Sequence, residues 1–182
     1  MIDFQEDDTD GYVSRTIKNA SADVTLAFAV DFETAGERLT KKSVIQQGKI
    51  YIPITISIFE SSRAMGGLAK FVTGMINDAK NEPITLNIAG NGIYRLKDTF
   101  IKNQKTLDYF IYQFISMLID NELKISQIRT GGQSGADEAG AKAGVKLGIP
   151  TLVLAPKKWK YRDIDNNDIF NENFFKERFN NQ

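Results

Sequence analysis

The sequence predicts an α/β protein built on a mostly parallel β-sheet with helices on both faces. Short apolar or β-branched runs alternate along the chain with longer amphipathic stretches, which is the pattern of repeated strand–helix–strand units. Several of the short runs are almost entirely apolar, as expected for strands that are covered on both faces. The 182 residues contain no internal repeat and no low-complexity linker, so we expect one domain.

The first predicted unit is the strand ADVTLAFAV, residues 22–30, with the helix that follows it. Thr34 or nearby Asp31 can cap this helix, because their side chains accept hydrogen bonds from the unpaired N–H groups of the first turn. Gly48 suits the C′ position, where the backbone takes a positive φ. We therefore expect a helix over residues 35–47.

The middle of the chain alternates in the same way. KIYIPITISIF, residues 49–59, is the second strand, and Pro53 places it at an end or an edge of the sheet because proline cannot donate a ladder hydrogen bond. Apolar residues at helical spacing predict a helix over residues 61–80, and PITLNIAG, residues 83–90, is the third strand. The clearest amphipathic helix covers residues 104–123.

The last third supplies two more strands. ISQIRT, residues 125–130, and TLVLAP, residues 151–156, are separated by a helix of small residues. The tail IFNENFFKERF predicts a short final helix. We interpret its phenylalanines as core or subunit contacts rather than as a ligand site: Phe170, Phe174 and Phe175.

Composition excludes several kinds of chemistry. The chain has no cysteine and no histidine, so disulfides, Ser–His and Cys–His nucleophile systems and the usual zinc sites are excluded. Its 23 basic and 23 acidic residues balance, which argues against general nucleic-acid or membrane-surface binding. No run approaches the roughly 20 apolar residues of a membrane span. The acidic start MIDFQEDDTD is unlike a signal peptide, so we expect a cytoplasmic protein.

Four loops should meet at one edge of the predicted sheet. In an open parallel sheet, ligands bind beyond the carboxyl ends of the strands, where the strand order reverses. The loops at those ends read DFETAGE, GNGIYR, GGQSGAD and PKKWKYRD. The first carries Thr34 and Gly36 at a helix start, and the last carries Lys157 and Lys158. Together they offer the close backbone approach, N–H donors and cations that a phosphorylated ligand needs.

The loop GGQSGAD, residues 131–137, is the strongest single signal. Its glycines stand where a strand leads into a helix, and a helix N-terminus presents unpaired N–H groups and the positive end of the dipole. A plain tight turn is the alternative explanation of the same glycines. As a phosphate-binding loop, it should line the main pocket with Gly131, Gly132 and Gly135 and turn the N–H groups of residues 133–137 toward an anion.

Each charged side chain in these loops has two interpretations. Arg95 is a phosphate ligand or a surface residue, and Asp137 accepts a ribose hydroxyl or stabilises the helix dipole. Glu37 and Glu138 carry the same alternatives as Asp137. The predicted ligand-binding residues are Thr34, Gly36, Glu37, Gly90, Asn91, Gly92, Arg95, Gly131, Gly132, Gln133, Ser134, Gly135, Asp137, Lys157, Lys158 and Trp159, the last as wall or lid. No metal site, cofactor or catalytic residue is predicted.

The stretch GGQSGADEAGAKAGVKLGIPTLVLAPK, from Gly131 to Lys157, resembles the SLOG superfamily. Those proteins are Rossmann-like domains that bind nucleotides and nucleotide-derived ligands. The glycine loop is most similar to that of the branch described as molybdenum-cofactor carriers. The resemblance implies a Rossmann-like sheet and a nucleotide-like small molecule as the partner.

The N-terminal half resembles the second half of the same superfamily, so the two halves stand in reversed order. The resemblance rests on Asn19, Ala22 and Asp23 before a strand, on the turn of residues 34–36, and on Gly48 and Lys49 before the next strand. We therefore expect a circularly permuted single domain over residues 1–182. Its parts are the second-half segment 15–60, a connecting helix 61–82, the first-half segment 83–163 and an aromatic tail 164–182.

The superfamily's phosphoribohydrolases use a Pro-Gly-Gly-x-Gly-Thr-x-x-Glu loop with a catalytic glutamate on the helix and an arginine earlier. Here Thr130 precedes the glycines, Ala136 stands where the hydroxyl belongs, and Glu138 is out of register. We therefore expect a non-catalytic binder: a sensor, a carrier, or a sponge that sequesters an ADP-ribose-type or cyclic-nucleotide immune signal. The alternative is a nucleotide-processing enzyme, of phosphoribohydrolase or N-glycosidase type, that uses a carboxylate near Glu138.

Two further expectations concern interactions. An inert interaction module whose glycine loops are only turns is the third functional hypothesis. The aromatic tail, together with helix-mediated pairing in the superfamily, predicts a homo-oligomer.

Overall fold

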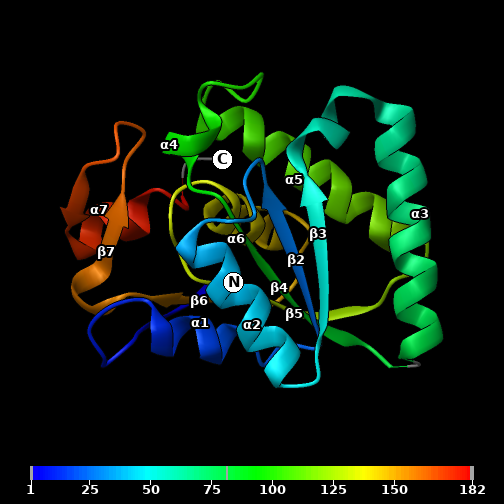
Figure 1. Ribbon diagram of the computed structural model, residues 1–182, viewed down its shortest axis with the longest axis horizontal. Helices are drawn as coiled ribbons and strands as arrows, with labels where there is room; N and C mark the ends of the chain where they lie inside the picture. The colour runs from blue at the N-terminus through cyan, green and yellow to red at the C-terminus, as the bar shows by residue number, and fades with distance from the viewer. Residues whose placement is uncertain (1, 81, 181–182) are drawn as a thin grey trace.

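A six-stranded parallel sheet forms the centre of the molecule (Figure 1). The computed structural model describes residues 2–80 and 82–180. The strands lie in the order β1-β6-β5-β4-β2-β3, and each neighbouring pair is parallel. Their bounds are β1 (Ile2–Glu6), β2 (Val24–Ala29), β3 (Ile50–Thr55), β4 (Ile84–Gly90), β5 (Ile125–Thr130) and β6 (Thr151–Ala155). The predicted α/β fold with a parallel sheet is confirmed.

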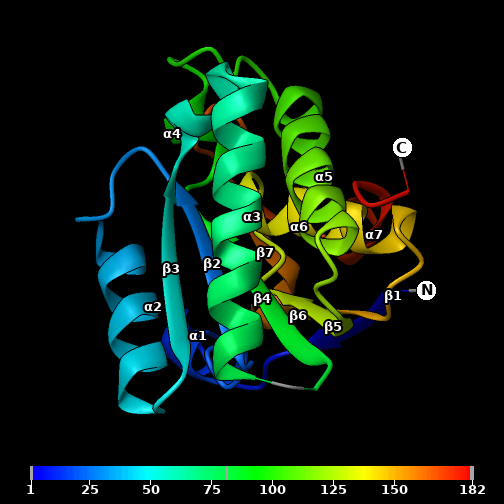
Figure 2. The same ribbon diagram turned by 90° about the vertical axis from the view of Figure 1, so that its right-hand side faces the viewer.

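Helices cover both faces of the sheet, which gives the Rossmann-like arrangement of three layers seen in Figure 2. On one face lie α1 (Val13–Asn19) and α2 (Ala35–Gln46). On the other lie α3 (Ser62–Ala79), α5 (Gln104–Asp120) and α6 (Ala136–Lys146), while α4 (Ile93–Leu96) is a single turn after β4. Within the described ranges, no helix has both the length and the apolar character needed to cross a membrane.

The main core lies between the sheet and the layer of α3, α5 and α6. Phe28 of β2 packs edge-on against Phe114 of α5, with ring centroids 5.7 Å apart. Helix α6 is rich in alanine and glycine because it lies directly on the sheet: a Cβ atom added to Gly140 would come within 2.5 Å of the Cβ of Ile88. The small residues of α6 therefore set the distance between this helix and β4.

Beyond β6 the chain adds a small unit that covers one edge of the sheet (Figure 1). It consists of η2 (Lys157–Trp159), the antiparallel pair β7 (Lys160–Arg162) and β8 (Asp168–Phe170), and α7 (Glu172–Glu177). Phe175 is fully buried against Phe4 and Trp159, so one tail phenylalanine is a core contact. Phe170 and Phe174 are 55% and 56% exposed. Self-association through them stays a prediction.

Two elements differ from the sequence-based expectation. The acidic start forms the edge strand β1 beside β6, because Ile2 and Phe4 alternate with polar residues and pack on the tail's aromatic cluster. The strand expected over residues 49–59 ends at Thr55, where η1 (Ile56–Glu60) turns the chain and buries Phe59. The edge position inferred from Pro53 is confirmed.

The close contact between α6 and β4 predicts how adding one methyl group at Gly140 changes the stability of the fold. Gly140→Ala should lower the free energy of unfolding by about 1–3 kcal/mol, because overpacking at Ile88 outweighs the gain in helix propensity. Gly74→Ala on α3 is the matched control: its added Cβ meets no atom within 4 Å, so stabilisation by about 0.5–1 kcal/mol is expected. Urea denaturation measures both. Equal effects of the two substitutions would contradict the close approach.

Candidate ligand-binding site

A cavity of about 440 Å³ lies where the strand order reverses. From β2 the chain continues to β3 on one side, and from β4 it continues to β5 on the other, so the loops after these two strands diverge. The lining comes from α1, the start of α2, the loops after β4 and β5, and β7: Tyr12, Val13, Arg15, Thr16, Asn19, Thr34, Ala35, Gly36, Glu37, Leu39, Thr40, Asn87, Ala89, Gly90, Asn91, Gly92, Tyr94, Arg95, Gly131, Gln133, Asp137 and Arg162.

Asn91 holds the two diverging loops together. Its side-chain oxygen accepts hydrogen bonds from the backbone N–H groups of Val30 and Asp31 at 3.0 and 3.2 Å, and its amide nitrogen donates to the carbonyl of Asp31 at 3.2 Å. Gly90 allows this approach, because its φ is +148° and a Cβ atom would overlap the carbonyl oxygen of Phe28. The floor of the cavity is therefore fixed by the backbone.

Glu37 enters the cavity wall from the first turn of α2. Thr34 caps this helix as predicted, accepting a hydrogen bond from the N–H of Glu37 at 3.2 Å. Glu37 is only 4% exposed, and its Oε2 has no hydrogen-bond partner. Burial, together with the nearby charge of Asp137, raises the pKa of Glu37 to about 7, against a smaller opposing effect of Asn91. This carboxyl group changes its charge near neutral pH.

Asp137 and Arg15 form a buried ion pair across the cavity floor. Arg15 lies on α1, donates a hydrogen bond from Nη1 to the carbonyl of Gly131, and places that atom 3.8 Å from Oδ2 of Asp137. Burial nevertheless raises the pKa of Asp137 to about 6, and it outweighs Arg15 and the N–H groups of Gln133 and Gly131. The same burial lowers the pKa of Arg15. Desolvation dominates because both side chains are at most 10% exposed.

Three side chains of the cavity wall carry a buried polar atom without a hydrogen-bond partner. They are Arg15, Asn19 and Glu37, through Nε, Oδ1 and Oε2 respectively, and each residue is at least nine-tenths buried. Buried polar groups in folded proteins almost always have a partner, and an unsatisfied one costs about 1–3 kcal/mol. One of these atoms is a donor and two are acceptors, and all three belong to residues that line the cavity.

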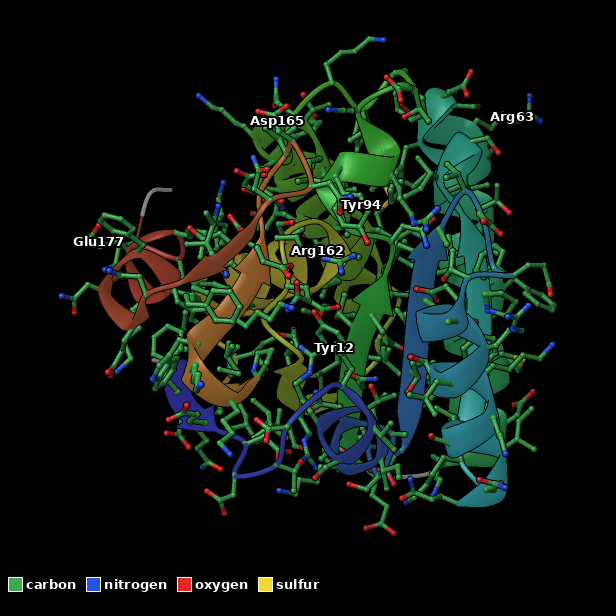
Figure 3. The ribbon with its side chains drawn as sticks, turned by 60° about the vertical axis from the view of Figure 1, so that its left-hand side comes forward. Tyr12, Arg63, Tyr94, Arg162, Asp165 and Glu177 are labelled. Carbon is green, nitrogen blue, oxygen red and sulfur yellow. The ribbon has the colours of Figure 1, made fainter. Side chains whose placement is uncertain are left out.

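Cations and aromatic rings border the cavity on the side of α4 and β7. Figure 3 shows Tyr94 and Arg162 beside one another, with Tyr12 below them in the view. The guanidinium carbons of Arg95 and Arg162 both lie 5.8 Å from the centre of the Tyr94 ring. Asp168 accepts a hydrogen bond from Nε of Arg162 at 3.0 Å. These three groups, Tyr94, Arg95 and Arg162, are called the cationic rim below.

The glycine loop is organised differently from the expected phosphate cradle. Three of its backbone N–H groups already donate within the protein: Gln133 to Asp137 at 3.3 Å, Gly135 to Oε1 of Gln104 at 2.6 Å, and Ala136 to the carbonyl of Asn91 at 3.3 Å. Gly135, with φ of +93°, fits closely against the Asn91 backbone. The loop is therefore packed and internally bonded rather than open toward the cavity.

Ten of the predicted ligand-binding residues line the cavity: Thr34, Gly36, Glu37, Gly90, Asn91, Gly92, Arg95, Gly131, Gln133 and Asp137. Gly132, Ser134, Gly135, Lys157, Lys158 and Trp159 do not. Lys157 pairs with Asp10 at 3.4 Å, and the Trp159 ring packs on Phe175. A Cβ at Gly132 would also meet Phe175, so the tail unit covers this side of the loop.

Glu138, the carboxylate named in the enzyme hypothesis, faces away from the cavity lining. It binds Lys142 at 2.7 Å and Arg178 of the tail, and both partners are largely buried. This ion-pair network joins α6 to the C-terminal segment. The structure thus gives Glu138 a structural environment, and the carboxylates of the cavity are Glu37 and Asp137.

Sequence reasoning missed the contribution of α1, which supplies Tyr12, Arg15 and Asn19, and that of Arg162. One signal for the site was present: Thr34 and Glu37 have the Thr-x-x-Glu spacing of the phosphoribohydrolase loop, and Arg15 is an arginine that precedes them. The sequence-based hypothesis assigned this motif to the glycine-rich start of α6, residues 131–138, instead. Nothing in the local sequence marks Arg162 as a cavity residue.

A second hollow of about 720 Å³ runs along the exposed edge between α2 and β3. Arg38, Lys41 and Lys42 give it a basic character. Its lining residues are exposed or half-buried, unlike the charged groups of the first cavity. Over the residues that the structure describes, no three acidic side chains gather closely enough to hold a metal ion.

Comparison of the chain with models of known protein families gives no match, and a comparison with curated protein sequences gives none either. The resemblance to the SLOG superfamily therefore rests on the glycine loop and the strand-flanking motifs alone. The parallel placement of β2 beside β4 agrees with the proposed permuted order but is shared by many α/β proteins.

The raised pKa of Glu37 predicts a pH-dependent cost of burying its charge. The unfolded chain ionises this group near 4.5 and the folded one near 7, so the folded state loses up to about 3 kcal/mol as the pH rises between those values. Glu37→Gln should therefore raise the free energy of unfolding by about 2 kcal/mol more at pH 8 than at pH 5. Chemical denaturation at both pH values measures the difference. The exposed Glu33→Gln is the control, and equal pH profiles for both variants would contradict the prediction.

Proposed function

We propose that the cavity binds a nucleotide-derived, phosphate-containing small molecule. The observation that carries the proposal is that three residues lining one cavity, Arg15, Asn19 and Glu37, each hold a buried polar atom without a hydrogen-bond partner. Folded proteins rarely leave such atoms unsatisfied, so a polar ligand is their natural partner. The position at the reversal of strand order is where open parallel sheets bind ligands.

The chemistry of the wall favours a sugar-containing ligand. Glu37 and Asp137 can accept hydrogen bonds from hydroxyl groups, and Arg15 and Asn19 add a donor and an acceptor on the facing helix. The cavity volume of about 440 Å³ falls in the range of small-molecule sites. Tyr12 and Tyr94 provide rings on which a base can stack. The SLOG resemblance points to the same ligand class, and a sensor, carrier or sponge of nucleotide signals is the corresponding role.

Asn19→Leu tests binding without removing a packed side chain. The variant should weaken ligand binding by about tenfold or more, because one buried acceptor is lost. Its melting temperature should not fall, since the unpartnered Oδ1 disappears with the substitution. Calorimetric titration with ADP-ribose, cyclic nucleotides and nucleoside monophosphates measures affinity, and the exposed Asn173→Leu is the matched control. A parent protein that binds no member of this panel would contradict the proposal.

A second candidate function, cleavage of an N-glycosidic bond in a nucleotide, is favoured by the state of Glu37. A general base works best when its pKa lies near the working pH, and burial raises the pKa of Glu37 to about 7. Ionised Glu37 would accept a proton from water as the water oxygen bonds to the anomeric carbon. The electron pair of the broken C–N bond would leave with the base, which takes a proton from solvent. Glu37 thus replaces Glu138 in this hypothesis.

Release of a free base from the nucleotide panel distinguishes the two candidates. If the protein is an enzyme, Glu37→Gln should lower the rate by about 10²- to 10⁴-fold, the usual contribution of a general base. Glu138→Gln is the control, because Glu138 lies outside the cavity and should retain activity per folded molecule. Chromatography of the products measures both. Binding without any product would support the non-catalytic role, and equal losses in both variants would contradict the assignment of Glu37.

A further inference from the structure

We propose that the cationic rim, formed by Arg95, Arg162 and the Tyr94 ring that both of them contact, binds the phosphate of the ligand, while the ligand's uncharged hydroxyl-bearing part lies inside against Glu37. This assignment rests on the proposed binding function and adds an orientation to it. It moves the phosphate away from the glycine loop, where the sequence pattern had placed it.

The inner end of the cavity is a poor place for an anion. Glu37 and Asp137 are both carboxylic acids at that end, and two charges of the same sign repel strongly where water is excluded. In the described part of the chain, the one guanidinium that forms an ion pair with either acid is that of Arg15, and it is already committed to Asp137 and the carbonyl of Gly131. A phosphate there would add a third anionic group to one cation.

Three backbone donors of the glycine loop are already used within the protein. The N–H groups of Gln133, Gly135 and Ala136 have protein acceptors, namely Asp137, Gln104 and the Asn91 carbonyl. Gly132 is also covered by the tail, because its carbonyl accepts a hydrogen bond from Arg178 at 2.9 Å. Binding an anion at this helix start would first require breaking these hydrogen bonds.

The rim has the opposite electrostatic character. Arg95 is exposed, and no ion pair of its guanidinium occurs in the described part of the chain. Arg162 and Lys160 share one carboxylate, that of Asp168. The Nζ atom of Lys160 lies 2.7 Å from Oδ2 of Asp168, and Nε of Arg162 lies 3.0 Å from Oδ1. Two cations, Lys160 and Arg162, therefore share one carboxylate, and Arg95 adds a further positive charge to the rim that a phosphate could balance. Asp168 also orients Arg162, so less side-chain freedom is lost when an anion binds.

The Tyr94 ring contacts both guanidinium groups of the rim. Each guanidinium carbon lies 5.8 Å from the ring centre, within the range of cation–π contact. The ring folds back over Gly92, where a Cβ atom would collide with it. The rim therefore combines a residue after β4 with one from β7, two segments that are far apart in the sequence.

The test compares nucleosides with their phosphates. Calorimetric titration uses the four ribonucleoside 5′-monophosphates and the four matching nucleosides, with the parent protein, Arg95→Ala, and the double variant Arg95→Ala/Arg162→Ala. The parent should bind at least one monophosphate more tightly than its nucleoside. The double variant should lose about tenfold or more in affinity for that monophosphate and keep its affinity for the nucleoside. Lys157→Ala/Lys158→Ala removes the same number of charges outside the cavity and should change neither affinity.

The outcomes separate this assignment from the proposed function. If the parent binds nucleosides and monophosphates equally well, or if the two lysines matter as much as the two arginines, the rim assignment is overturned and the binding function stands. If the parent binds none of the eight compounds, the rim assignment is overturned, and the binding function falls with it only if ADP-ribose and the cyclic nucleotides do not bind either. Arg95→Ala removes an exposed side chain, so it remains informative if loss of the Arg162–Asp168 contact unfolds the β7–β8 pair.

Discussion

The reversal of strand order between β2 and β4 is the constraint on which the site depends. Because the chain leaves these two strands in opposite directions, their loops cannot pack on each other along their whole length. Asn91 closes the floor by bonding to the backbone after β2, and Gly90 removes the Cβ that would prevent it. What remains open above this floor is the cavity. The position of the site therefore follows from topology, and its chemistry from the side chains that surround it.

Burial shifts the pKa values of the acidic groups in the site. Two carboxyl groups, Glu37 and Asp137, sit in a nearly dry enclosure with one arginine, and desolvation raises the pKa values of both acids. This arrangement costs stability at neutral pH, and packing alone gives no reason for Glu37 to be there, since its Oε2 bonds to nothing. A ligand that supplies hydrogen bonds would recover part of that cost. Strain of this kind is typical of functional sites.

The sheet and its principal helices could be predicted because period and capping are local signals. The continuous apolar run of β2, the Thr34 cap and the amphipathic α5 are each visible in a short window of sequence. The cavity loops after β2, β4 and β5 followed from the rule for parallel sheets. Arg15 and Arg162 could not be found in this way, because only tertiary packing brings α1 and β7 to the cavity. The glycine loop was correctly placed near the site, yet its N–H groups are used within the fold, which no local pattern reveals.

Amide chemical-shift mapping by NMR tests the central claim most directly, because it reports both whether a nucleotide binds and where. Titration of the isotope-labelled protein with the nucleoside monophosphates should shift the amides of Gly36, Gly92 and Gly131, which line the cavity from the first turn of α2 and from the loops after β4 and β5. Lys41 and Lys42, in the hollow between α2 and β3, serve as internal controls and should stay unchanged. Saturable shifts confined to the cavity residues would agree with the account. No shifts at millimolar ligand, or shifts centred on the hollow between α2 and β3, would contradict it.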